Sequence, residues 1–368
     1  MQIIERVIDD IKLNYPLEKL SPCEQCLFID IETTGFTART SNLYLIGCVY
    51  FKDGVFRSVQ FFADEYSEET EVIDRFFDFA SDYKYLIHFN GNNFDIPYIA
   101  AKCMEHGLDH SFDAFDGVDI FRRISPYKNF LKVENCKQKT IEKFLKIDRE
   151  DIYTGGDLIG IYHSYVSEKD PAKKDLLLLH NYEDIKGLVN ILPILSYFDL
   201  FNEKVVVTKV SANYFNDTSN QRHSELLMTL NTPSDLPIPV SLSVDGCYFA
   251  GASGQAMLRV PLYEEELKYY YANYKEYYYL PAEDTALHKS VASFVDRSHR
   301  VQATADTCYT RKRSQFLPEW DAVVNPFFKK EYSSKNLFFE LTNERKTDRE
   351  LFSTYASHVL DHMKKYNK

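Results

Sequence analysis

Short apolar runs alternate with amphipathic stretches over the first 200 residues of the chain. Four apolar runs of strand length are predicted strands: 26–31, 44–51, 55–62 and 85–89. Apolar residues at helical spacing predict five helices: 67–83, 94–106, 140–145, 157–166 and 172–198. Lys52-Asp53-Gly54 is a tight turn signal between two of the strands. Strands that alternate with helices in this way predict an α/β domain with a mixed sheet over residues 21–200.

Residues 1–20 are expected to form a separate amphipathic helix. Ile4, Val7, Ile8 and Ile11 recur at helical spacing, with charged residues between them. Because charges interrupt the apolar period, we expect neither a secretion signal nor a transit peptide. No stretch approaches the roughly 20 consecutive apolar residues that a membrane-spanning helix needs. The expected location is therefore the cytoplasm, with no membrane partner.

The pattern changes after residue 200. A cluster of Pro233, Pro237 and Pro239 predicts a linker or loop, and Asp245-Gly246 predicts a hairpin turn. Residues 284–295 are expected to form a helix with Asp284 as its N-cap. With 368 residues the chain is longer than one typical domain needs, so we expect a smaller α+β domain at 201–368.

Composition and charge narrow the class of protein. Hydrophobic residues make up 45% of the chain, which excludes wholesale disorder. Cys23 and Cys26 form one CxxC without a second pair nearby, so free thiols are preferred over a zinc site. The formal net charge is −12, and the whole excess lies in residues 1–200, which hold 34 acidic against 22 basic residues. A cluster of carboxylates that holds divalent cations would push a domain in this direction.

The segment FIDIETTG, residues 28–35, carries the strongest chemical signal. Side chains alternate along a strand, so Asp30 and Glu32 lie on the same face at the end of an apolar run. Two carboxylates placed in this way repel each other unless a cation lies between them. The alternative is a pair of solvated charges at a strand end.

Two further segments add acids. Asp95 lies in the first turn of a predicted helix, where it is either a ligand or a cap. His180 and Asp184 lie one turn apart on one helical face, where they form either part of a site or a simple hydrogen bond. Taken together, Asp30, Glu32, Asp95 and Asp184 suit two Mg²⁺ or Mn²⁺ ions, which prefer oxygen ligands. His180 could then accept a proton from the attacking water as general base.

These segments resemble a known family. FIDIETTG, NGNNFDIPYI (90–99) and HNYED (180–184), in this order, resemble the three motifs of the DEDD 3′–5′ exonuclease superfamily, which has a ribonuclease-H-like fold. Four intervening segments resemble the YprB-type family: TARTSNLYLIG (37–47), VDIFRRI (118–124), NCKQKTIEKFLKI (135–147) and DIYTGGDLIGIYHSYV (151–166). The resemblance covers residues 20–200 and implies a five-stranded mixed sheet whose four acids bind the metals.

The resemblance also assigns further residues and shows one departure. Members of the superfamily usually have either a Tyr with three residues between it and the last Asp, or a His with four. In this chain three residues separate His180 from Asp184, so His180 stands at the Tyr spacing. Tyr182 is only two residues before Asp184 and is expected to point away, so His180 is the favoured base. Asp119 is expected to support the ligands or the fold. The resemblance places five residues against the terminal nucleotide: Thr33, Thr34, Gly35, Asn90 and Phe94.

The second half offers candidate binding features without a family. The tract 262–280 holds eight tyrosines interleaved with Lys268 and Lys275, which could stack on the bases of a single strand. The alternative, which we favour, is that about half of them face a core. Residues 311–313, Arg-Lys-Arg, form a basic spot suited to phosphate or a solvated turn.

The sequence therefore predicts a metal-dependent nuclease. The leading hypothesis is a two-metal-ion 3′–5′ exonuclease that acts on single-stranded ends of DNA or RNA, with residues 201–368 guiding the strand. One alternative is a metal-dependent endonuclease on structured nucleic acid. The other is a nucleic-acid-binding protein that has the fold and no turnover, although such a protein gains little from keeping mutually repelling carboxylates.

Overall fold

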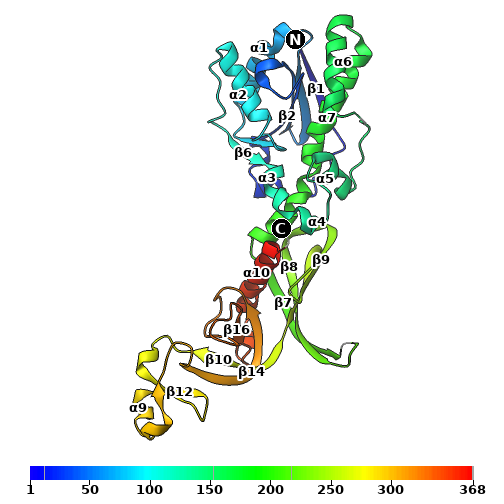
Figure 1. The fold of residues 1–368 in the computed structure, drawn as a ribbon. Helices are drawn as coiled ribbons and strands as arrows, with labels where there is room; N and C mark the ends of the chain where they lie inside the picture. Colours follow the sequence, from blue (N-terminus) through cyan, green and yellow to red (C-terminus); the bar gives the residue numbers. More distant parts are fainter. Residues whose placement is uncertain (12, 152, 217, 367–368) are drawn as a thin grey trace. The chain divides into compact units, whose positions relative to one another are not determined.

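A computed structural model describes residues 1–11, 13–151, 153–216 and 218–366 (Figure 1). The chain divides into two compact units. The first comprises residues 1–198 and 236–238, and the second comprises 199–235 and 239–368. Among the described residues, every helix is too short or too polar to span a membrane.

The first unit is built on a six-stranded mixed sheet. Its strands are β1 (Gln2–Ile8), β2 (Cys26–Thr33), β3 (Leu43–Lys52), β4 (Val55–Phe62), β5 (Tyr85–His88) and β6 (Asp116–Asp119). They lie in the order β1-β4-β3-β2-β5-β6. The pairs on the β1 side are antiparallel, while β5 is parallel to both β2 and β6. The predicted α/β class is confirmed, and the sheet has one strand more than the five expected.

Eight α-helices of the described residues lie between the strands of this sheet or follow them in the chain. They are α1 (Glu69–Ala80), α2 (Asp95–His106), α3 (Ile120–Ile124), α4 (Lys128–Leu131), α5 (Gln138–Leu145), α6 (Gly155–Glu168), α7 (Pro171–Asn190) and α8 (Leu195–Asn202). Helix α1 packs on β3 and β4, and α7 packs on β2, β3 and β4. Figure 1 shows α1 and α7 on opposite sides of the sheet. Both faces of the central strands are therefore buried, which explains the continuous apolar runs of β2 and β3.

The N-terminal helix prediction is wrong. Gln2–Ile8 forms β1, which pairs antiparallel with β4, and residue 12 of the expected helix lies outside the described residues. Ile4 and Ile8 lie on one face of the strand and are more buried than Ile3 and Val7, which lie on the other face. The β-branched residues favour a strand, and the edge of β4 pairs with the segment from Gln2 to Ile8.

The second unit is mainly antiparallel sheet. Its strands are β7 (Val206–Asn216), β8 (Arg222–Val244), β9 (Cys247–Pro261), β10 (Tyr263–Tyr270), β11 (Tyr277–Leu280), β12 (Thr285–His288), β13 (Val301–Gln302), β14 (Tyr309–Glu319), β15 (Phe327–Phe328) and β16 (Leu337–Glu340). They form three sheets, β7-β8-β9, β10-β14-β16-β15 and β12-β11-β13. The unit also contains the short helix α9 (Lys289–Ala292) and the longer α10 (Arg349–Tyr366), which packs on β7 and β9.

Both predicted hairpin turns are confirmed. Asp53 and Gly54 have φ values of 53° and 81°, and Asp245 and Gly246 have φ values of 48° and 80°. Two consecutive residues at positive φ are what a two-residue hairpin turn requires, and Asp-Gly adopts them readily. The turns therefore fix the β3–β4 and β8–β9 connections.

The linker predicted at Pro233, Pro237 and Pro239 is wrong, because all three lie within β8. The register between β7 and β8 ends at Asn231, so the prolines lie beyond the segment that β7 covers. Proline is tolerated in a strand where its missing amide is not needed for pairing.

The helix predicted at 284–295 is also wrong. Residues Thr285–His288 form β12 on β11, and only Lys289–Ala292 are helical. Phe294, which should have faced a core, is 91% exposed. Asp284 is not an N-cap; it has φ 50° and its carboxylate accepts hydrogen bonds from the hydroxyls of Tyr279 and Tyr309. Pairing with β11 therefore overrides the helical spacing.

Candidate active site

Strand β2 carries the first two acids into the middle of the first unit. The residues before them, from Cys26 to Ile29, are almost completely buried between the layers. Asp30 pairs with Gly47 of β3 across the sheet, and Glu32 follows on the same face and is buried. The register between β2 and β3 shifts after Glu32, where Thr33 pairs with Leu43, and β2 ends at Thr33, directly after the two carboxylates.

Asp95 joins the pair from the start of α2. Strand β5 pairs with β2 only as far as Phe28, which leaves the Ile31 amide without a strand partner on that side. The Oδ1 atom of Asp95 accepts that amide at 3.2 Å. Asp95 is thus both buried in the first turn of a helix, where a negative charge is favoured, and tied to the backbone between Asp30 and Glu32.

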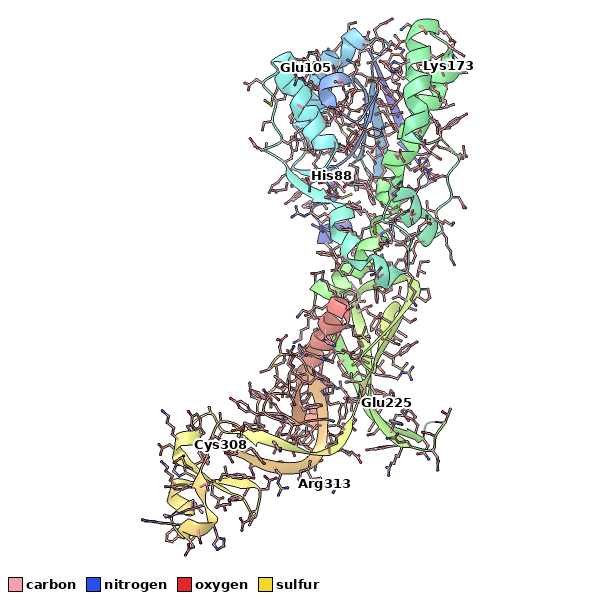
Figure 2. All side chains as sticks on the ribbon, in the orientation of Figure 1. His88, Glu105, Lys173, Glu225, Cys308 and Arg313 are labelled. Carbon is pink, nitrogen blue, oxygen red and sulfur yellow. The ribbon has the colours of Figure 1, made fainter. Side chains whose placement is uncertain are left out.

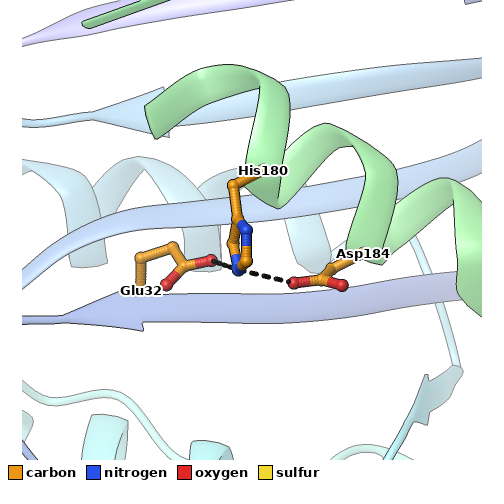
Figure 3. A group of neighbouring side chains, drawn as sticks. All are labelled: Glu32, His180 and Asp184. Carbon is orange, nitrogen blue, oxygen red and sulfur yellow. Dashed lines mark ion pairs between the residues drawn. The ribbon is translucent and has the colours of Figure 1, made fainter. Parts of the chain in front are cut away.

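His180 and Asp184 lie one turn apart on α7 and face Glu32 of β2, as Figure 3 shows. The Nε2 atom of His180 is 3.1 Å from Oδ2 of Asp184 and 3.7 Å from Oε1 of Glu32. Potential ligand atoms of these three residues all lie within 4.8 Å of one another. The i, i+4 spacing places His180 beside Asp184 on α7, and the packing of α7 on β2 brings the same ring to Glu32.

Most of the expected site residues line a single cavity of about 490 Å³ in the first unit. It contains nine of them: Asp30, Glu32, Thr33, Gly35, Asn90, Phe94, Asp95, His180 and Asp184. Thr34 is outside its lining, and its Oγ1 accepts the amide of Asn42. Asp119 is also outside; its carboxylate accepts the amides of Asn90 and Asn92 and so holds the loop before α2. The ring of Tyr182 lies against Arg6 and Lys186 and is not in the lining.

The acids disturb one another's protonation. Burial, followed by repulsion from Asp184, Asp95 and Glu32, raises the pKa of Asp30 well above its usual value. Burial raises the pKa of Glu32 to about 8 against the opposing effect of His180. Burial also raises the pKa of Asp95 to about 7, in spite of the amides that it accepts. This arrangement disfavours the ionised acids and would be relieved by a cation.

Arg149 is a charged residue at this site that the sequence did not reveal. Its Nη1 atom lies 2.7 Å from Oδ1 of Asp184 and 3.1 Å from both carboxylate oxygens of Glu142 on α5. Burial alone would raise the pKa of Asp184, but the hydrogen bond from His180 and the charge of Arg149 keep it below its usual value. Arg149 follows α5 in a run of charges, DRED (148–151), in which nothing marks it for the site.

His180 is buried, which by itself would lower its pKa. The hydrogen bond to Asp184 and the charges of Glu32 and Asp151 outweigh burial and raise the pKa to about 9. The three carboxylates around the ring therefore dominate its electrostatic environment.

Asn181 is a second residue that was missed. Its Nδ2 donates to Oδ2 of Asp30 at 3.2 Å, and its Oδ1 accepts from Nε2 of Gln60 at 3.0 Å. Both amides are completely buried. A Cβ on Gly47 would lie 2.0 Å from Oδ1 of Asn181, so the glycine leaves the space that this side chain fills. The only sequence signal was the neighbourhood of His180.

The candidate binding features of the second unit are largely engaged with one another. Tyr271 stacks on Tyr277 with centroids 4.5 Å apart, and Tyr270 contacts Tyr309 and Tyr332 edge-on. All eight tyrosines of the tract are partly buried, which supports the packing interpretation.

The basic spot is also partly neutralised. Arg311 pairs with Glu266 at 3.3 Å and with Asp284 at 3.5 Å, and Lys312 pairs with Glu340 at 2.7 Å. Arg313, labelled on β14 in Figure 2, is exposed. A role of these residues in guiding a strand stays a prediction.

Comparison with solved structures gives distant similarities. Exonuclease I, in a structure described as suggesting how processivity is achieved, is 12% identical with a TM-score of 0.30, and the match covers 56% of this chain and 55% of that one. The zinc-bound complex of E. coli ExoI with single-stranded DNA is 11% identical with a TM-score of 0.28, covering 56% and 54%. The family B DNA polymerase of Pyrobaculum calidifontis is 18% identical with a TM-score of 0.38, covering 49% of this chain and 26% of the polymerase.

The chain thus spans about a quarter of the polymerase and just over half of exonuclease I in these matches. A comparison with curated proteins found no match. A family model described as the RNase_H superfamily matches residues 27–196, the range that contains β2, α2 and α7 with their acids. Residues 27–196 of this chain therefore form a ribonuclease H superfamily domain.

Proposed function

We propose that this protein is a two-metal-ion 3′–5′ exonuclease that hydrolyses phosphodiester bonds at single-stranded ends of DNA or RNA. The observation that carries the proposal is the meeting of Asp30, Glu32, Asp95 and Asp184 in one cavity with His180 beside them. These residues come from three elements far apart in sequence, so local structure alone does not account for their meeting.

The residues fit a pair of hard divalent cations. Four carboxylates supply only oxygen donors, which Mg²⁺ and Mn²⁺ prefer. Burial and mutual repulsion raise the pKa values of Asp30, Glu32 and Asp95, so the protein compensates their ionised forms only in part. Arg149 and His180 compensate only Asp184 closely. A site with this imbalance is stabilised by added positive charge.

The cations would lower the pKa of the attacking water and stabilise the leaving oxygen. When bound cations offset the carboxylate charges that raise the pKa of His180, this residue would accept the water proton at Nε2, the nitrogen that faces Glu32 and Asp184. Asn181 keeps the Asp30 carboxylate in place through its hydrogen bond to Oδ2. Asp95 stays aligned because it accepts the amide of Ile31. The protein thus supplies fixed carboxylates and one proton acceptor.

The rim of the cavity suits a nucleotide. Phe36 lines the cavity and is 83% exposed, and its ring meets Phe94 edge-on with centroids 6.5 Å apart. An exposed aromatic ring can stack on an unpaired base. Lys137 lines the cavity and is exposed, and the structure records no side-chain partner for it within the described residues. Its ammonium group is suited to a backbone phosphate.

The test is digestion of single strands of DNA and of RNA, each labelled at the 5′ end, with Mg²⁺, Mn²⁺ or EDTA. The proposal expects a ladder that shortens stepwise from the 3′ end, release of mononucleotides and no cleavage in EDTA. Internal cuts would instead indicate an endonuclease. Absence of products with either metal would indicate a binding protein without turnover, and either result refutes the proposal.

Variants connect the activity to the site. Asp30→Ala and Asp184→Ala are expected to abolish cleavage while the fold is kept, because each removes a carboxylate from the cavity. Asp78→Ala is the matched control, since Asp78 is an exposed acid on α1 outside the cavity. Retained cleavage in either site variant would remove that residue from the ligand set.

A further inference from the structure

Phe294 follows helix α9 and is 91% exposed, the largest exposed fraction among the large apolar residues that the structure describes. Val291, three residues earlier, is 56% exposed. Removing apolar surface from water is favourable, and aromatic rings contribute strongly to binding surfaces. The exposed ring with its apolar neighbour is therefore a candidate contact surface in the second unit.

The turn that carries Phe294 is held by hydrogen bonds on both sides. The amide of Phe294 donates to the carbonyl of Val291 at 3.2 Å, and the guanidinium of Arg300 donates to the carbonyl of Ala292. Ala292 is completely buried, and α9 packs on β11 and β12. An ordered support thus presents the ring to solvent, so a partner can bind it with little loss of conformational entropy.

The same turn is basic within an acidic chain. From β12 to β13 the chain holds three basic residues and one acid, which are Lys289, Arg297, Arg300 and Asp296. The chain as a whole has a formal net charge of −12. Asp284, directly before β12, is already paired with Arg311 at 3.5 Å. The local excess of positive charge favours an anionic partner.

The basic groups lie around the turn in different settings. Nζ of Lys289 lies 5.9 Å and Cζ of Arg300 lies 4.9 Å from the ring centroid of Tyr278. Arg297, three residues after Phe294, is exposed, and no ion pair to its guanidinium is found among the described residues. Lys289 and Arg297 thus stand on either side of Phe294 in the chain, where their charges can contact phosphate oxygens.

We propose that Phe294, together with Lys289 and Arg297, forms a binding surface for single-stranded nucleic acid, in which the ring stacks on an unpaired base and the two cations contact neighbouring phosphates. Stacking on aromatic rings and neutralisation of phosphates are the interactions that hold single strands without sequence preference. The inference rests on the proposed function only for the choice of nucleic acid as the anion, and the binding itself needs no cleavage.

Two other occupants fit these observations less well. A helix that binds a membrane surface needs a long apolar face or an added lipid chain, whereas α9 has four residues. A stable interface with a second copy of the chain buries at least about 1,000 Å² in total. The exposed large apolar residues from β12 to β13 are three, Val291, Phe294 and Val301, which is a small patch for such an interface.

The test measures binding of fluorescein-labelled oligothymidylate and oligouridylate to the full-length protein by fluorescence anisotropy in EDTA. Phe294→Ala should raise Kd about 5- to 150-fold, the equivalent of one lost stacking contact. In Lys289→Gln combined with Arg297→Gln, the slope of log Kd against log salt should fall by about 0.7 for each phosphate contact that is lost.

Two variants serve as matched controls. Met104→Ala removes an apolar side chain that is 84% exposed on α2, and Lys52→Gln removes an exposed positive charge at the end of β3. Both controls should keep the Kd and the salt slope of the wild type. Because Phe294 and Arg297 are exposed, their substitution should leave the unfolding temperature unchanged, which separates a lost contact from a lost fold.

Wild-type affinity in Phe294→Ala, or no binding of either strand by the wild type, would overturn the inference. If Phe294→Ala left strand binding intact but abolished binding to phosphatidylserine vesicles, the surface would belong to a membrane. If the variant instead lowered the sedimenting mass with strand binding intact, the surface would belong to a second copy.

Failure of the proposed function is distinguishable from failure of this inference. A wild type that binds strands through Phe294 in EDTA, yet cleaves neither DNA nor RNA with metal, supports the inference and refutes the nuclease. An active nuclease whose strand affinity does not depend on Phe294 does the reverse.

Discussion

Gly47→Ala tests the support beneath β2, the strand that carries Asp30 and Glu32. Gly47 lies opposite Asp30 in the β2–β3 pairing, and an added Cβ would lie 2.0 Å from Oδ1 and 2.8 Å from Cγ of Asn181. Neither distance is compatible with van der Waals contact, so Asn181 must move. Because it is completely buried and bonded to Gln60 and Asp30, it has no equivalent place to go.

The cost follows from these contacts. Leaving the buried amide and its partners unsatisfied costs about 1–3 kcal/mol. Overpacking of a filled interior adds about 1–3 kcal/mol. Replacing glycine in a regular strand returns about 0.5–1 kcal/mol. We expect the first unit to lose roughly 2–4 kcal/mol of unfolding free energy in the metal-free protein.

The assay is denaturant unfolding followed by circular dichroism, with tryptophan fluorescence as an internal reference. Trp320 is the single tryptophan and lies in the second unit, so its transition should not move. Gly117→Ala is the control, because its Cβ would lie an ordinary 3.7 Å from His88. In Gly47→Ala combined with Asn181→Ala the clash is gone, so the two costs should be less than additive. Wild-type stability in Gly47→Ala, or full additivity in the double variant, would refute the reasoning.

Three further predictions concern charge. Asp30→Asn should raise the unfolding temperature of EDTA-treated protein, by about 2–4 °C for each kcal/mol of relieved repulsion. The substitution should also reduce the stabilisation of the protein by Mn²⁺. An unchanged unfolding temperature would contradict the raised pKa of Asp30. Arg149→Gln should cost about 3–5 kcal/mol in the metal-free protein because it leaves Asp184 and Glu142 buried without their cation. Mn²⁺ should stabilise this variant more than the wild type, and calorimetry with and without the metal checks both points. Burial raises the pKa of Glu319 from 4.5 to about 7, so its contribution to stability is present below pH 4.5 and is lost as pH rises towards 7. Glu319→Gln should flatten that part of the profile of stability against pH, followed by Trp320 fluorescence. An unchanged profile would exclude Glu319 as the source of the pH dependence.

The sequence determined the frame of the first unit because its signals are local. Buried strands between two layers are apolar throughout, so β2, β3 and β4 were found within two residues of their ends. The Asp-Gly turns were found because few residue pairs accept two positive φ values. The same holds for the acids on β2, since alternation along a strand needs no tertiary information.

Where the sequence failed, pairing with another strand decided the structure. Residues 2–8 have a helical apolar period, yet they pair with β4, which supplies a partner for every register position from Gln2 to Ile8. Residues 285–288 likewise join β11 in the second unit. Propensity and spacing are weak terms of about 1 kcal/mol or less for each residue, and packing against the neighbouring strand outweighs them.

The sequence by itself determined which acids and which histidine could act together, because strand alternation and the helical turn place each pair on one face. Only the tertiary structure decided what surrounds them: Asp151 behind the ring of His180, Arg149 beside Asp184, and Asn181 beneath Asp30. These contacts join loops, helices and strands between 29 and 151 residues apart, and they depend on distances of about 3 Å that no local pattern encodes.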